Sequence, residues 1–311
     1  MKKGLIIQGI KTKTSVSVFV STLFYVFLAS FFIEGGLWLS SELVGPFSIA
    51  IGYLTEFFSP GNGVASIQEF FYHYILYYEL FSFVFILLLF IFWVKVIEKN
   101  SLSSLGIVKR NWLKYLGWGI LLSLLQMGVI ALVYQVGGIG TFELNELSLD
   151  PILFILGLFP FWLLQGGTEE VATRGWLLTR IAARANLPLA IAISSSLFGI
   201  LHLGNAGVTV LSVLNIVLDG LLLIYTDSIW LVVAQHGTWN YVQGNLLGFQ
   251  VSGTGTDASI FSFTMGSGPD WLTGGEFGAE GSIITTLVLL VSVVIVYLLG
   301  ERREKVVTEL V

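Results

Sequence analysis

The sequence predicts an all-α protein, a polytopic bundle of about eight transmembrane helices with both termini in the cytoplasm. Three observations lead to this fold class. Of the 311 residues, 55% are hydrophobic and only 11% are charged, whereas soluble domains carry roughly 25% charged residues. Several apolar runs approach the ~20 residues that a helix needs to cross a bilayer. The fifteen Lys and Arg gather in a few short clusters between these runs.

Residues 1–104 are expected to form the first two spans and the loop between them. Residues 15–33 follow a lysine-rich start, and we interpret them as a retained span because their apolar stretch exceeds that of a signal peptide and no Ala-x-Ala-like cleavage site follows. Residues 34–62 contain acids and prolines and are expected to be an outer loop or an interfacial helix. Residues 70–94 form the second expected span, which ends at lysines.

Residues 105–249 are expected to form a five-span core, and residues 250–311 an outer loop and the last span. The core spans are expected at 115–136, 151–166, 188–203, 207–225 and 228–249, and the last span at 283–300. The loops at 137–150 and 251–282 contain acidic residues but no Lys or Arg. With this layout every basic residue falls on one side, which the positive-inside rule assigns to the cytoplasm. The whole chain is expected to be one integral membrane unit.

Composition also excludes several classes of protein. The chain has no cysteine, which excludes disulfides, thiolate metal sites and a cysteine nucleophile. It lacks the Gly-x-Ser-x-Gly motif of serine hydrolases. No basic surface suited to nucleic acid is present, so the lipid bilayer is an expected partner and nucleic acid is not.

An ionisable cluster lies in residues 165–174, after the fourth expected span. Such groups beside a membrane span are candidates for a functional site, because they persist where they face a protein interior or a water-filled cavity. Glu170 and Arg174 are four residues apart, which predicts an ion pair on one helix face. Glu169 projects about 100° away around the helix. It is therefore left to face another group.

The later histidines have polar or aromatic partners at helical spacing. The chain has three histidines: His73, His202 and His236. Phe198 and His202 are four apart, as are His236 and Asn240, so each pair shares a helix face. His202 is positioned to hold a water against the carboxylate of Glu169, which makes that water a nucleophile. His236 and Asn240 are donors suited to an oxyanion, each contributing ~2.7–4 kcal/mol in a water-poor site. We interpret His73 as interfacial and Asp219, within the sixth span, as a structural partner.

These residues form three motifs that occur in the same order in a known family. The motifs are Glu169-Glu170-x-x-x-Arg174, Phe198-x-x-x-His202 and His236-x-x-x-Asn240. Over residues 105–245 the chain resembles the CPBP intramembrane proteases, which include the prenyl-protein (CAAX) endopeptidases of the Rce1 type and the Abi, bacteriocin-immunity-like bacterial members. The eight-span layout looks like that of the family. One departure is Thr173, where family members often have an aromatic residue.

The resemblance implies an intramembrane endopeptidase that acts on a peptide or a lipidated protein. It implies that Glu169 and His202 activate water and that His236 and Asn240 stabilise the oxyanion, with Glu170, Arg174 and Phe198 in support. No sequence feature distinguishes a prenyl group from another apolar tail.

The sequence leaves open whether the protein uses a metal ion and whether it is an enzyme at all. Glu169, His202 and His236 could hold a zinc ion with one open coordination position. Because His-Glu-x-x-His is absent and Asn240 is a poor zinc ligand, we favour a glutamate protease without a cofactor. The alternative functions are a non-catalytic immunity or scaffold protein and, less favoured, a transporter, for which no inverted repeat is evident.

Overall fold

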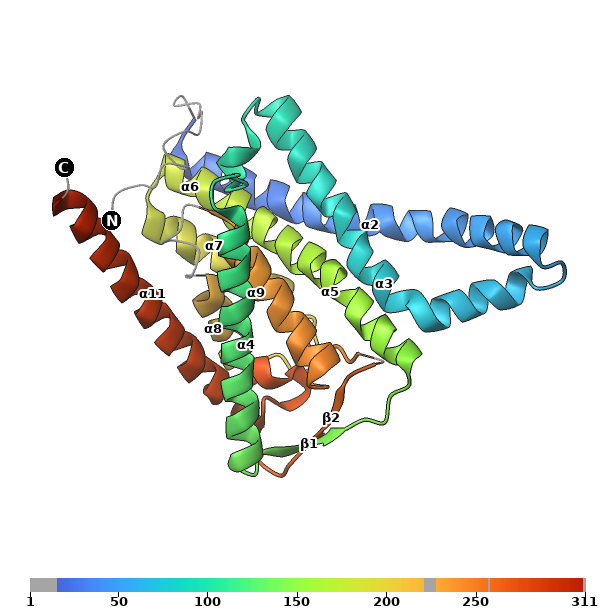
Figure 1. The fold of residues 1–311 in the computed structure, drawn as a ribbon. Helices are drawn as coiled ribbons and strands as arrows, with labels where there is room; N and C mark the ends of the chain where they lie inside the picture. Colours follow the sequence, from blue (N-terminus) through green and yellow to red (C-terminus); the bar gives the residue numbers. More distant parts are fainter. Residues whose placement is uncertain (1–15, 221–227, 257, 310–311) are drawn as a thin grey trace.

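The computed structural model describes residues 16–220, 228–256 and 258–309, and these are mostly helical (Figure 1). The α-helices are α2 (Val18–Phe58), α3 (Gly63–Phe92), α4 (Trp112–Val136), α5 (Leu149–Glu170), α6 (Thr179–Arg184), α7 (Leu187–Leu201), α8 (Val210–Gly220), α9 (Trp230–Tyr241), α10 (Asp270–Thr273) and α11 (Ile283–Glu309). Three π-helical segments extend α3, α5 and α9: η1 (Trp93–Ile97), η3 (Val171–Leu178) and η5 (Val242–Leu246). Short 3-10 turns occupy Leu102–Leu105, Gly275–Phe277 and Ala279–Gly281.

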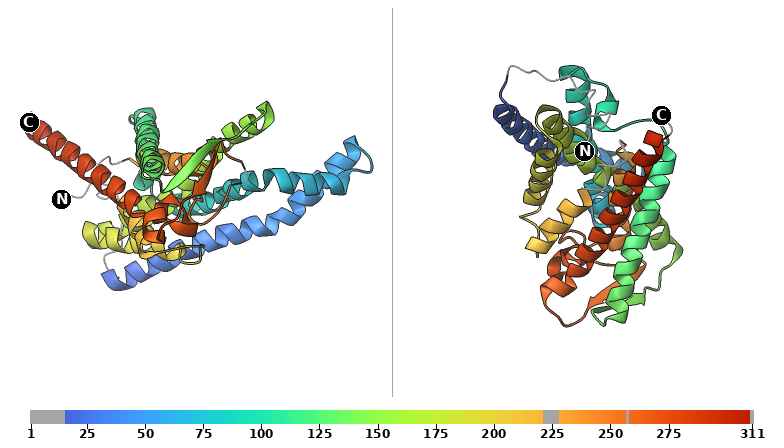
Figure 2. Two further views of the ribbon diagram at one scale, coloured as in Figure 1. Left: turned by 90° about the horizontal axis from the view of Figure 1, so that it is seen from below. Right: turned by 90° about the vertical axis from the view of Figure 1, so that its left-hand side faces the viewer.

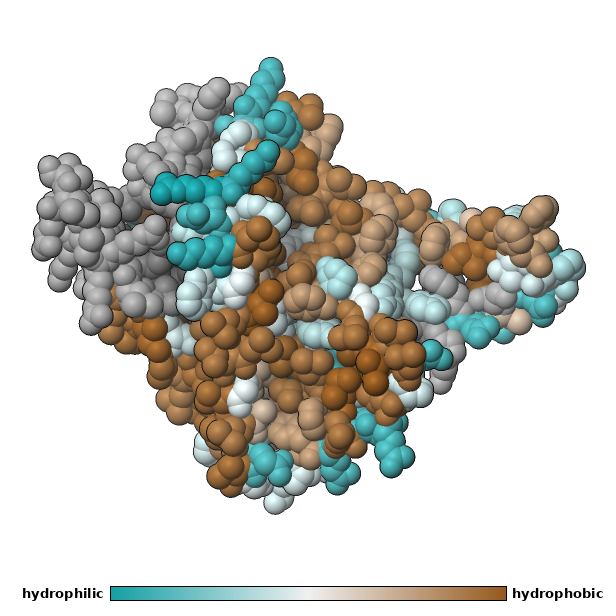
Figure 3. All heavy atoms as spheres, in the orientation of Figure 1, coloured by the Kyte–Doolittle hydropathy of each residue, from teal (hydrophilic) through white to brown (hydrophobic). Residues whose placement is uncertain are grey.

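The described residues contain four helical segments long and apolar enough to cross a membrane. These are Val18–Phe58, Tyr74–Ile97, Trp112–Val136 and Leu149–Arg184, and two shorter apolar helices cover Leu187–Leu201 and Ile283–Ile295. Hydrophobic side chains cover most of the face shown in Figure 3, and hydrophilic residues gather above and below them. These features indicate an integral membrane protein, whereas eight spans, cytoplasmic termini and the division at residues 104 and 249 stay predictions.

Two expected features lie partly outside the described residues. The sixth expected span, residues 207–225, begins with α8, but residues 221–227 are not described. The side chains of His73 and Asp219 are likewise not described.

The first helix is longer than expected. An outer loop at residues 34–62 is the wrong interpretation, because α2 continues to Phe58 through Pro46. In apolar surroundings the backbone must satisfy its own hydrogen bonds, so a helix persists where a water-exposed chain would turn. Helix α3 begins at Gly63, earlier than expected, and packs against α2. The two helices form an arm that projects from the rest of the bundle (Figures 1 and 2).

The two acidic loops, residues 137–150 and 251–282, contain regular secondary structure. They form a small sheet that the all-α prediction missed. Strand β1 (Gly140–Leu144) pairs antiparallel with β2 (Phe261–Met265), and Phe142 lies opposite Phe263. The later loop also contains α10, and its Phe277 is fully buried. Each strand has only five residues and pairs with a strand far along the chain. The sequence therefore contains no alternation of polar and apolar residues long enough to predict a strand. The later loop packs against the C-terminal end of α4, where Tyr134 donates to the carbonyl oxygen of Thr273 at 3.0 Å.

Helix α5 continues past residue 166, the expected end of the fourth span, as the helical spacing of Glu170 and Arg174 predicts. It continues through Glu170 into η3 and α6, so that residues 149–184 form one helical rod. A π-helical segment widens the helix and often marks a functional site. Here it begins directly after Glu170, which places both glutamates inside the bundle.

A buried ion pair attaches this rod to the end of α3. Arg180, 1% exposed, donates to Glu98 with Nη2 and Oε2 2.5 Å apart, and its Nη1 donates to the carbonyl oxygen of Ser104 at 2.8 Å. The indole of Trp176 donates to Glu98 Oε1 at 2.9 Å. These contacts fix the end of α3 and η1 against η3 and α6, the part of the rod that follows the two glutamates.

We expect Arg180→Ala to lower the free energy of unfolding by about 1–3 kcal/mol, because it removes the charged hydrogen bonds to the partly buried Glu98 and to the carbonyl oxygen of Ser104. Thermal unfolding in detergent measures the change. Exposed Arg110→Ala is the control and should stay within about 0.5 kcal/mol. Adding Glu98→Leu to Arg180→Met should recover part of the loss; equal stability of wild type and Arg180→Ala would contradict the assignment.

The orientation of the bundle is testable with single cysteines, because the chain has none of its own. Glu146 lies in an outer loop and Lys109 precedes α4, and both residues are exposed. In intact cells a membrane-impermeant maleimide should label Glu146→Cys, and it should label Lys109→Cys only after permeabilisation. The reverse pattern would invert the predicted topology.

Candidate active site

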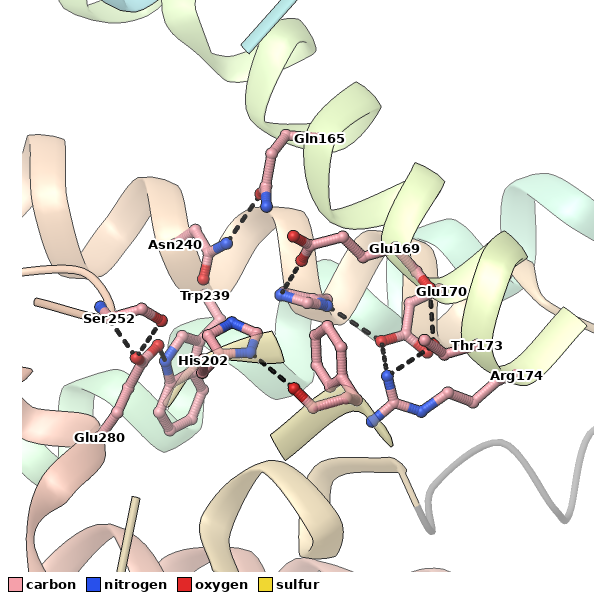
Figure 4. A network of polar contacts seen from close by, with 12 residues as sticks. Gln165, Glu169, Glu170, Thr173, Arg174, His202, Trp239, Asn240, Ser252 and Glu280 are labelled. Carbon is pink, nitrogen blue, oxygen red and sulfur yellow. Dashed lines mark hydrogen bonds and ion pairs between the residues drawn. The ribbon is translucent and has the colours of Figure 1, made fainter. Parts of the chain in front are cut away.

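Three elements that are distant in sequence meet at the polar centre of the bundle (Figure 4). The end of α5 carries Glu169 and Glu170, the turn after α7 carries His202, and α9 carries His236 and Asn240. Glu170 is 1% and Asn240 4% exposed. The structure therefore brings the predicted site residues of all three motifs together.

The ion pair predicted between Glu170 and Arg174 is present. Arg174 Nη1 lies 3.1 Å from Glu170 Oε1, and both side chains are 1% exposed. Arg174 also donates to Thr173 Oγ1 at 2.9 Å. Its guanidinium carbon lies 4.4 Å from the centre of the Phe198 ring, a cation–π contact. Thr173, at the position where an aromatic residue is common, thus supports the arginine by a hydrogen bond.

His236 lies between the two glutamates. Its Nδ1 is 3.0 Å from Glu170 Oε1, and its Nε2 is 3.5 Å from Glu169 Oε2. A carboxylate only accepts hydrogen bonds, so each contact needs a proton on the facing nitrogen. The 3.5 Å contact is longer than a good hydrogen bond. Glu169 is therefore held less tightly than Glu170.

His202 has its tautomer set by the turn that holds it. Helix α7 begins at the capping side chain of Asn186, which accepts from the amide of Leu189. At the other end His202 caps the helix, and its Nδ1 lies 2.8 Å from the carbonyl oxygen of Phe198. A carbonyl only accepts, so Nδ1 carries the proton. In the neutral ring, Nε2 is then an acceptor available to water or substrate.

His202 separates two cavities. The larger, about 190 Å³, is lined by Glu169, by Glu34 of α2 and a few other polar residues, and by apolar side chains of α2, α3 and α7. The smaller, about 50 Å³, is lined by His236, Asn240 and Glu280. His202 and Phe198 line both. The ring of Phe198 packs at 4.7 Å from that of His202 and 6.0 Å from that of His236, so it spaces the two histidines.

Two polar residues of the site were not singled out in the sequence. Gln165 Oε1 accepts from Asn240 Nδ2 at 2.9 Å, and its position in a span near the acidic pair was an available signal. Glu280 accepts from the indole of Trp239 at 3.0 Å and from Ser252 Oγ at 2.8 Å. Nothing local in the acidic outer loop marks Glu280, because only the packing of that loop onto α9 brings it here.

The alternative to a glutamate protease is a zinc ion held by Glu169, His202 and His236. Within residues 16–220, 228–256 and 258–309, no three His, Asp or Glu side chains are grouped closely enough to hold one. Glu169 and His202 line the same cavity, and His236 Nε2 lies 3.5 Å from Glu169 Oε2. No step below is therefore routed through a metal.

Helices α5 and α9 approach closely because glycine faces glycine. A Cβ added to Gly166 would lie 2.8 Å from the amide nitrogen of Gly237, and one added to Gly237 would lie 2.7 Å from the carbonyl oxygen of Trp162. The absence of a side chain at Gly166 thus permits close packing of the two backbones. This contact sets the distance between the glutamates and His236.

The comparison with known proteins confirms the resemblance inferred from the motifs. Residues 151–242 match the family model described as type II CAAX prenyl endopeptidase, Rce1-like. The match runs from α5 to the end of α9 and includes all three motifs. Neither the curated proteins nor the solved structures contain a significant match to the chain. The match and the apolar helices indicate a membrane protein of peptidase type.

We expect Gly166→Ala to lower the free energy of unfolding by about 1–3 kcal/mol, since the added methyl group has no room against α9. Gly128→Ala on α4 is the matched control, because a Cβ there meets nothing within 4 Å. Thermal unfolding of both variants in detergent measures the effect. Equal stability of the two would show that the helices do not depend on this contact.

Proposed function

We propose that the protein is an intramembrane endopeptidase that hydrolyses a peptide bond near the cytoplasmic membrane surface with a water activated by Glu169 and His202. The observation that carries this proposal is the position of His202. It shares the larger cavity with Glu169 and the smaller one with His236 and Asn240. A water and a scissile carbonyl bound beside His202 would therefore have the base Glu169 on one side and the donors His236 and Asn240 on the other.

Glu169 is the general base of the proposed reaction. Its carboxylate lines the larger cavity, where the acceptor Nε2 of His202 orients a water. As the water oxygen bonds to the carbonyl carbon, its proton passes to Glu169. Glu169 then gives this proton to the leaving amine as the carbon–nitrogen bond breaks. Glu170 is not used in this step, because Arg174 and His236 hold its Oε1 and its side chain lines neither cavity.

His236 and Asn240 are the proposed oxyanion donors. The amide of Asn240 has two N–H groups, and Gln165 takes one of them. The other remains for the substrate. The long contact between His236 Nε2 and Glu169 can be exchanged for a contact with a developing oxyanion when Glu169 accepts its proton. Donors placed in a site that excludes water stabilise the transition state by several kcal/mol.

The proposed substrate is a peptide or lipidated protein that enters from the bilayer. The larger cavity is lined by Ile33 and Leu37 of α2, by Phe83 of α3 and by Leu201 of α7. These side chains favour an apolar group beside Glu169. The description of the matching family, a prenyl endopeptidase, supports a prenylated peptide as the first substrate to test.

We expect Glu169→Gln and His202→Ala to lower kcat by about 10²–10⁴-fold, because each removes a group that handles the water. Cleavage of quenched peptides, with and without a farnesyl group, is measured in proteoliposomes. Exposed Glu146→Gln is the control, and thermal unfolding checks that each variant is folded. Full activity in either site variant would refute the mechanism. A protein that acts only by binding would keep its cellular phenotype in both.

A further inference from the structure

The smaller cavity contains acceptors that the proposed reaction does not use. Glu280 lines it and accepts three hydrogen bonds, from Trp239 Nε1 at 3.0 Å, from the Ser252 amide at 3.1 Å and from Ser252 Oγ at 2.8 Å. A carboxylate can accept about four hydrogen bonds. Glu280 is therefore held in place and keeps about one acceptor position.

Asn215 supplies a second acceptor. Its Nδ2 donates to the carbonyl oxygens of Glu280 at 2.8 Å and Ser282 at 3.1 Å, which fixes the orientation of the amide. Its side chain is 3% exposed and lines the same cavity, and Oδ1 has no partner among the described residues. A buried acceptor without a donor is costly. Beside Asn215 and Glu280 the cavity thus lacks a donor, although the donors His236 and Asn240 also line it.

The charges around the cavity favour a cation. None of the ion pairs among the described residues involves Glu280. Nearby, Glu170 is paired with Arg174, and both Glu169 and Glu170 face ring nitrogens of His236. Glu280 is therefore the carboxylate of this cavity that has no cationic partner among the described residues, and in a partly buried site its charge attracts a cation more strongly than in water.

The volume selects a small cation. A cavity needs roughly 10–15 Å³ to hold one water, and this one measures about 50 Å³. A primary ammonium is close to a water in size and has three donors and no acceptor, whereas a guanidinium is a broad plane. The ammonium matches the cavity in size, charge and donors.

We propose that the cavity beside Glu280 and Asn215 is a subsite for a primary ammonium group of the substrate, which makes Glu280 a specificity-determining residue. The inference rests on the proposed function and adds a substrate class: peptides with a lysine side chain, or a free amino terminus, close to the scissile bond. The same charge disfavours a substrate carboxylate at this position.

The first test uses the wild-type protein in proteoliposomes. Quenched peptides with Lys, Nε-acetyl-Lys or Glu at each position flanking the scissile bond are compared, each with a free or an acetylated amino terminus. At one position Lys should raise kcat/KM at least tenfold over acetyl-Lys, with Glu lowest. A gain that follows the free amino terminus instead would assign the subsite to that amine. Equal cleavage of all forms would overturn the subsite and leave the protease standing.

Glu280→Gln tests the residue itself. The variant keeps the size of the side chain and removes its charge, so the ratio of Lys to acetyl-Lys cleavage should fall below twofold. Glu276→Gln is the matched control, because Glu276 lies on the same segment and is exposed. It should keep the wild-type ratio. A tenfold ratio retained in Glu280→Gln would overturn the assignment.

Binding separates the subsite from the reaction and needs no variant of Glu280. Uncleavable peptides with a reduced peptide bond, containing Lys or acetyl-Lys, are titrated against the wild-type protein in detergent. A Kd at least tenfold lower for Lys supports the subsite, even if no peptide is cleaved and the proposed function fails. Equal Kd values overturn it, whatever the outcome for cleavage.

Discussion

The buried ion pair between Glu170 and Arg174 is the interaction on which the rest of the site depends. A charge in an apolar bundle is tolerated only with a partner, and removal of one partner leaves the other uncompensated. Glu170 also accepts from His236 Nδ1, so the pair sets the position of that ring as well. Arg174 in turn lies over Phe198, which packs against both histidines. One neutralised carboxylate therefore organises three helices and leaves Glu169 to the larger cavity.

The close approach of α5 and α9 brings the ionisable side chains of the two helices within contact distance. Because Gly166 lies directly against Gly237, the glutamates and His236 are within reach of one another without long, flexible connections. The site is held by helices rather than loops, which favours the precise placement that catalysis requires. The exception is the segment with Ser252 and Glu280, which reaches the same centre from the outer side. The charge of Glu280 on that segment then affects which groups the smaller cavity binds.

Much of the helical layout was predictable, and the failures have physical causes. The third expected span, residues 115–136, agrees with α4, because an uninterrupted apolar run with basic residues at one end has one stable arrangement in a bilayer. The end of the first span was misplaced because Pro46 and acidic residues are loop signals in water, but the helix continues through them to Phe58. The pairing of β1 with β2 was missed because each strand is stabilised only by a partner more than a hundred residues away.

The sequence by itself determined the membrane class, the three motifs and the pairing of Glu170 with Arg174. A helix repeats every 3.6 residues, so contacts at a spacing of four follow from the chain alone. Only the tertiary structure decided that His236 lies between two carboxylates, that His202 separates two cavities and that Glu280 lines the smaller of them. Those contacts cross between elements, and their distances depend on how glycines, aromatic rings and the outer segment pack. Local spacing therefore identified the chemical groups, whereas packing decided what each one faces.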